Sequence, residues 1–142
     1  MPYRFVEGVA RADVAFEASG KTLEELFGSS GKALTRSMVE NPESIESRES
    51  VKFSLKNDNM EKLLHDFLQE IIFHKDAESL IFNDFNLKVT EKKGECSVEA
   101  ILKGEEIDNK KHHMIVDVKA VSWHMYKVEK EDEWKAFVIL DV

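Results

Sequence analysis

The feature that most constrains this fold is a stripe of apolar residues at three- and four-residue spacing in the middle of the chain. The stripe consists of Met60, Leu63, Leu64, Phe67, Leu68, Ile71 and Ile72. This spacing puts all seven on one side of a helix, where they face a core. Asp58 or Asn59 can cap the start of that helix. The other face of the predicted helix carries Glu61, Lys62, His65, Asp66, Gln69 and Glu70.

A second helix is predicted nearer the N-terminus. It opens with a capping box, in which Thr22 and Glu25 satisfy each other's free backbone donors. Its apolar residues are Leu23, Leu26, Phe27, Leu34 and Met38. Gly28 and Gly31 weaken its middle by about 1 kcal/mol each relative to Ala, so this helix depends on tertiary contacts. The pair Asn41-Pro42 ends it, because a residue before proline avoids the helical region.

The remaining segments alternate apolar and polar side chains, which predicts strands. These segments are residues 14–18, 51–56, 85–90, 96–102, 115–121, 123–130 and 134–141. A turn at Lys92-Lys93-Gly94 joins the third and fourth segments into a predicted antiparallel hairpin. We therefore predict an α+β fold, one domain over residues 1–142, with a mostly antiparallel β-sheet packed with two main α-helices.

Charge and composition narrow the class of partner. Lys and Arg total 20 while Asp and Glu total 28, giving a formal net charge of −8. A chain this acidic releases few counterions from a nucleic-acid backbone. We therefore expect no stable direct nucleic-acid binding. No segment reaches the roughly 18 apolar residues of a membrane span, and no apolar N-terminal signal is present. With the single Cys96, these features predict a cytoplasmic protein without disulfides, cysteine-rich zinc sites or membrane contact.

The motifs that usually mark enzymes are absent, and we expect no catalytic or organic cofactor-binding residue. Residues 28–32 (GSSGK) imitate part of a phosphate loop, but small residues at a close helix contact explain them better. His112 and His113 are interpreted as parts of a solvated loop, and His124 as a half-buried structural histidine. Cys96 has no cationic neighbour to lower its pKa, which argues against a nucleophile.

Two carboxylates stand in unusual places. Asp13 precedes an apolar strand, where aspartate has poor strand propensity, and Asp141 follows the apolar run 136–140. Val142 adds the terminal carboxylate, so three negative groups converge if the first and last strands are neighbours. Hard oxygen donors suit Ca²⁺ or Mg²⁺. By spacing alone, however, aspartates at strand ends are more often turn formers.

Taken together, these segments resemble the archease family. The matching stretches are residues 118–124 (VKAVSWH), 128–129 (VE), 134–142 (WKAFVILDV), 12–20 (ADVAFEASG) with 23–27 (LEELF), and 63–73 (LLHDFLQEIIF). They cover essentially the whole chain and occur in the family's order. One departure is that many archeases have His-Thr-Ala before the early aspartate, whereas this chain has Ala10-Arg11-Ala12. That change removes a polar contact and adds a cation near the aspartate.

The resemblance implies a function. Archeases activate the tRNA-splicing RNA ligase without being the ligase: they speed formation of its guanylylated intermediate and support multiple turnover. They carry a divalent metal, often calcium, which by the resemblance would be held here by Asp13, Asp141 and Val142. Lys119 matches a family lysine associated with function and is a candidate for contact with a nucleotide or the partner. Ca²⁺ is therefore the expected ion, with Mg²⁺ as the alternative.

Two other classes remain as alternatives. A small metal-dependent hydrolase could use the same carboxylates to activate water, with His124 as the available general base. A chaperone-like or methyltransferase-modulating binding module would need a large exposed apolar patch, whereas the apolar stripes of the predicted helices are taken up by the core.

Overall fold

The computed structural model describes residues 2–7 and 13–142. Within these residues the chain forms seven strands, two α-helices and one short 3₁₀ helix. In chain order they are β1 (Tyr3–Val6), β2 (Val14–Gly20), α1 (Leu23–Met38), η1 (Pro42–Ser44), β3 (Glu49–Asn57), α2 (Met60–Glu78), β4 (Leu80–Lys92), β5 (Glu95–Glu106), β6 (Ala120–Lys130) and β7 (Trp134–Asp141).

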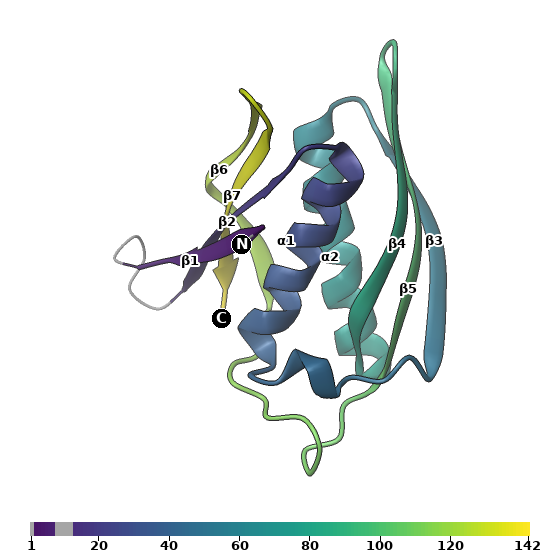
Figure 1. The fold of residues 1–142 in the computed structure, drawn as a ribbon, viewed down its shortest axis with the longest axis vertical. Helices are drawn as coiled ribbons and strands as arrows, with labels where there is room; N and C mark the ends of the chain where they lie inside the picture. Colours follow the sequence, from purple (N-terminus) through teal and green to yellow (C-terminus); the bar gives the residue numbers. More distant parts are fainter. Residues whose placement is uncertain (1, 8–12) are drawn as a thin grey trace.

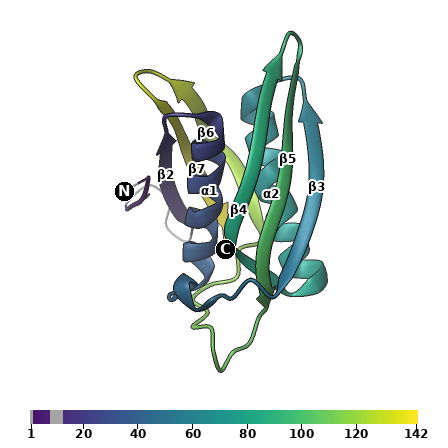
Figure 2. The same cartoon turned by 45° about the vertical axis from the view of Figure 1, so that its right-hand side comes forward.

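The strands form two antiparallel sheets with the two helices between them (Figure 1). One sheet has the order β1-β2-β7-β6 and the other the order β3-β5-β4. Helix α1 contacts β2 on one side and β4 on the other, while α2 contacts β6 and the strands of the second sheet. Figure 2 shows the same layering after a rotation of 45°. The α+β class predicted from the sequence, with mostly antiparallel pairing, is confirmed.

Both predicted helices form where their caps predict. The Thr22 hydroxyl accepts a hydrogen bond from the Glu25 amide at 3.1 Å, which is the Thr22 half of the predicted capping box. Asn59 caps α2 by accepting from the Lys62 amide at 2.8 Å. The α2 stripe is buried throughout. Within residues 2–7 and 13–142, no helix combines the length and apolar character needed to cross a membrane.

The interpretation of residues 28–32 as a close helix contact holds at Gly31. A Cβ atom there would lie 2.7 Å from the Phe85 ring, so any larger residue would have to displace this ring where α1 lies against β4. Gly28 differs, because a Cβ atom would meet nothing within 4 Å. The predicted hairpin is also confirmed: β4 and β5 pair along their length, and Gly94 adopts φ +79° in the turn between them.

Two strand predictions need correction. Residues 115–121 were expected to form a strand of their own, but β6 begins at Ala120 and runs on through residues 123–130. The segment before it bonds to the end of α1 instead, since the Ile115 amide donates to the Met38 carbonyl. The sequence analysis also missed β1, a four-residue edge strand that is too short to give a clear alternation.

Candidate functional site

The two ends of the chain meet in the first sheet, because β2 and β7 are paired neighbours. Val14 is opposite Leu140 in this antiparallel ladder. Asp13 comes one residue before Val14 and Asp141 one residue after Leu140, so both aspartates lie at the same end of the strand pair. The condition for the predicted carboxylates to converge, that the first and last strands be neighbours, is therefore met.

Lys119 reaches the same place from the other side of β7. Its backbone amide donates to the Asp141 carbonyl at 2.8 Å, and the next residue, Ala120, pairs with Asp141 in the sheet. We call Asp13, Lys119, Asp141 and Val142 the chain-end site. The lysine is exposed, whereas the other three residues are half-buried.

Within the described part of the chain, the fold makes no use of the side-chain carboxylates of this site. Among residues 2–7 and 13–142, no hydrogen bond or ion pair forms with the side chain of Asp13 or Asp141. Nor does any group of three or more His, Cys, Asp or Glu side chains in these residues lie close enough to hold a metal ion. A cation here would depend on the two aspartates together with a backbone or terminal oxygen of Val142. Such an all-oxygen donor set fits Ca²⁺ or Mg²⁺. Ala10 and Arg11, where the chain departs from the family pattern, lie outside the described residues.

Beyond the chain-end site, β6 leaves the sheet and then returns to it. Ser122 pairs with Ile139 and Lys127 with Phe137, so residues 123–126 on β6 bulge out opposite a single residue of β7. His124 lies in this bulge and is exposed, not half-buried as predicted. The prediction placed His124 in a regular strand, whereas the bulge takes it out of the regular pairing of β6 with β7.

The polar face of α2 covers the outer edge of β6. The His65 Nε2–H donates to the Val121 carbonyl at 3.0 Å, and Gln69 accepts from the Val121 amide. Glu61 accepts from the Val128 amide at 3.3 Å. The face predicted to lie opposite the core therefore satisfies the unpaired backbone of an edge strand. Burial lowers the pKa of His65, which keeps its ring neutral at pH 7.

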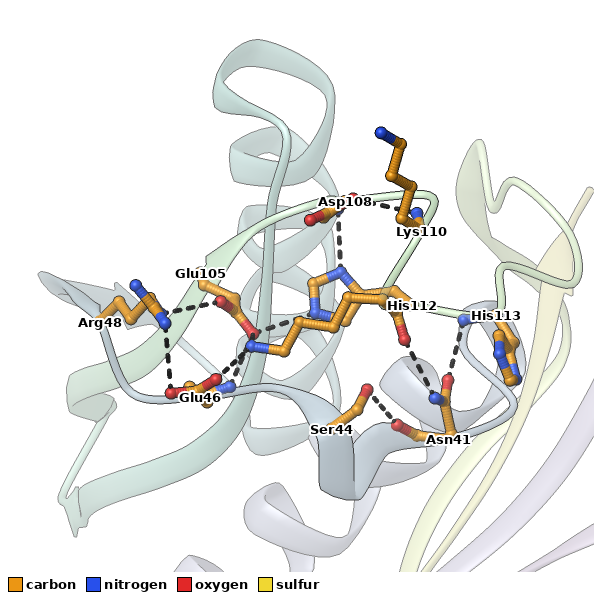
Figure 3. A network of polar contacts seen from close by, with 10 residues as sticks. Asn41, Ser44, Glu46, Arg48, Glu105, Asp108, Lys110, His112 and His113 are labelled. Atoms are coloured by element: carbon orange, nitrogen blue, oxygen red, sulfur yellow. Dashed lines mark hydrogen bonds and ion pairs between the residues drawn. The ribbon is translucent and has the colours of Figure 1, made fainter.

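A second charged cluster lies in the second sheet, at the C-terminal end of β5, around the buried carboxylate of Glu105 (Figure 3). This carboxylate accepts from the Lys111 ammonium at 2.8 Å, from His112 Nε2 at 3.0 Å and from the Glu46 amide at 2.8 Å. Arg48 Nε lies 3.4 Å from its second oxygen. Burial by itself would raise the pKa of Glu105, but these donors outweigh it and hold the pKa at about 2.

His112 corrects another prediction. It was expected in a solvated loop with His113, but its side chain is fully buried, while His113 is exposed. Its Nδ1 accepts from the Asp108 amide at 2.9 Å, which leaves the proton on Nε2 for the bond to Glu105. The seven-residue separation of Glu105 and His112 corresponds to no metal or catalytic motif, so no sequence signal marked this pair.

Cys96 is buried near the β4–β5 turn. Burial, followed by the nearby carboxylates of Glu91, Asp58 and Glu95, raises the pKa of its thiol. A raised pKa leaves little thiolate at pH 7, in agreement with the prediction that Cys96 is not a nucleophile.

Comparison with known proteins connects the whole chain to one family. Residues 3–142 match the model of the Archease protein family (MTH1598/TM1083). A protein archease from Methanopyrus kandleri is 33% identical over 143 residues and covers 100% of both chains. One from Pyrococcus furiosus is 32% identical over 133 residues, 92% of this chain and 93% of its own. The solution structure of Methanobacterium thermoautotrophicum protein 1598 superposes with a TM-score of 0.85 at 32% identity, covering 99% of each chain.

Proposed function

Because this chain belongs to the archease family, we propose that it is a non-catalytic activator of the tRNA-splicing RNA ligase. In this role it promotes guanylylation of the ligase and its repeated turnover in tRNA processing. The observation that carries the proposal is the convergence of Asp13, Lys119 and Asp141 at one end of the β2–β7 pair. These are the positions that match the functional residues of the family.

The charge of the chain supports this proposal. A ligase active site that binds RNA and a nucleotide is positively charged, and a protein with a net charge of −8 is attracted to it over a distance. The chain-end site is a suitable point of contact, because its carboxylates have no internal partner among the described residues.

Each residue of the site has a proposed role. Asp13, Asp141 and Val142 would hold a divalent cation, Ca²⁺ or Mg²⁺, that fixes the start of β2 against the end of β7. Lys119 uses its backbone amide for the fold and its side chain is exposed, so its ammonium group would contact a phosphate or a carboxylate on the ligase.

The test is a ligase guanylylation assay with the wild type, Asp13→Asn and Asp141→Asn. Loss of a direct metal ligand should reduce stimulation at least about tenfold, because changes even to outer-shell partners of metals cost 10–100-fold. Stimulation by the wild type should fall with a chelator and return when Ca²⁺ or Mg²⁺ is restored.

The matched control is Asp132→Asn. Asp132 is an exposed aspartate at the opposite end of the β6–β7 pair from Asp141. The Asp132→Asn variant should therefore stimulate the ligase like the wild type. Full stimulation by a folded Asp13→Asn variant would contradict the proposed role of the site. Release of phosphate from phosphate esters by the metal-loaded protein alone would instead favour a hydrolase.

A further inference from the structure

Two large apolar side chains, two residues apart in the sequence, are exposed on the β6 bulge. We call residues 123–126 the β6 knuckle. Trp123 is 58% exposed and Met125 is 56% exposed, although most apolar side chains of the described chain are buried. An exposed tryptophan and an exposed methionine on one bulge leave apolar area in water that a bound partner would cover.

The knuckle is held rigidly. The Trp123 ring stacks on the His65 ring at a centroid distance of 3.6 Å and an angle of 3°, and the Tyr126 ring meets both edge-on. The Tyr126 hydroxyl donates to the Glu61 carbonyl at 2.6 Å. An aromatic side chain that is already fixed in place loses little entropy on binding, and tryptophan is enriched among residues that dominate binding energy.

The backbone of the knuckle is strained at Met125. Its φ is +59°, in the left-handed region that glycine and asparagine tolerate and that other residues enter at a cost. The described chain thus keeps an exposed methionine where asparagine would fit the backbone better. Backbone strain at an exposed side chain is typical of residues that contact a ligand or partner.

The surroundings of the knuckle are acidic. Glu61 and Asp66 lie close enough that, after burial, their charges raise the pKa of Tyr126. The nearby cations are already paired: Lys62 with Asp58 at 3.6 Å, and Lys127 with Glu129 at 2.9 Å. An acidic rim disfavours a phosphate backbone and favours a protein surface that carries lysine and arginine.

We propose that the β6 knuckle is the anchor by which this chain docks on a protein partner, into an apolar pocket rimmed by basic residues. This inference rests on the proposed function, which makes that partner the RNA ligase. It also explains how the chain-end site would be positioned. Ala120, three residues before Trp123, pairs with Asp141, so a partner seated on the knuckle lies beside the proposed cation.

The test measures binding of the ligase to the wild type and to Trp123→Ala and Met125→Asn by surface-immobilised kinetics. Met125→Asn removes the apolar side chain but suits the left-handed backbone, so it keeps the fold even if Trp123→Ala does not. Each variant should weaken binding at least about tenfold, mainly through faster dissociation. Higher salt should slow association of the wild type.

The control is Phe73→Ala, which removes an equally exposed ring (55%) from α2 and should bind within twofold of the wild type. Wild-type binding by both knuckle variants would overturn the docking role, even if Asp13→Asn fails to activate and the proposed function stands. Saturable binding of a single-stranded RNA that requires Trp123 would also overturn it. If the wild type does not bind the ligase at all, the proposed function is wrong, and the docking role that rests on it is wrong as well.

Discussion

The two charged regions of this molecule use carboxylates in opposite ways. Glu105 is buried and accepts hydrogen bonds from a lysine, a histidine and a backbone amide, with an arginine beside it. Asp13 and Asp141 are half-buried and engage no partner within residues 2–7 and 13–142. A carboxylate satisfied from within the chain stabilises the fold, whereas one left unsatisfied is available for a cation or partner from outside. The carboxyl groups of the two regions are chemically alike, so their position and their partners decide how each is used.

The largest effect should come from Glu105→Ala. This change leaves His112 Nε2 and the Lys111 ammonium without their buried acceptor, which should lower the free energy of unfolding by about 3 kcal/mol. Urea denaturation at pH 7 measures it. The neighbouring, exposed Glu106→Ala serves as the control and should change stability by less than about 0.5 kcal/mol. Equal stability of the Glu105 and Glu106 variants would break the comparison.

A slightly smaller effect is expected from calcium. At about one hundred times its Kd, Ca²⁺ should stabilise the wild type by about 2.7 kcal/mol, because the proposed site exists only in the folded chain. Thermal unfolding with and without Ca²⁺ measures this shift. Asp141→Asn should lose it, while Glu105→Gln should keep it. A shift that survives Asp141→Asn would place the cation elsewhere.

The smallest effect concerns acid. Glu105→Gln keeps one acceptor oxygen, so at pH 7 it should be roughly 1–2 kcal/mol less stable than the wild type. The pKa of Glu105 is about 2 in the folded chain, below its usual 4.5. Its contribution is therefore complete above about pH 4.5 and is lost as the pH falls toward 2. Urea titrations across this pH range should show the stability of the wild type approaching that of Glu105→Gln as the pH falls. A stability difference that stays constant would argue against the hydrogen-bond network around Glu105.

The outcome of the sequence predictions depends on how local each signal is. The α2 stripe and its Asn59 cap lie within 14 residues, and both are confirmed by the structure. Asp13 was singled out for its poor strand propensity, and the structure does pair its strand with the last one. His65 and His112 could not be predicted, because their burial depends on β6 and on the Glu105 network, which are distant in sequence or carry no motif.

The sequence by itself determined the helices, most strands and the family, because apolar periodicity, capping residues and motif order are all written in neighbouring positions. Tertiary structure alone decided which polar groups are used internally. The bulge at residues 123–126 exposes Trp123 because four residues of β6 must fit opposite one of β7. The pairing of β2 with β7 likewise brings together carboxylates 128 positions apart, since hydrogen bonds between strands do not depend on distance along the chain.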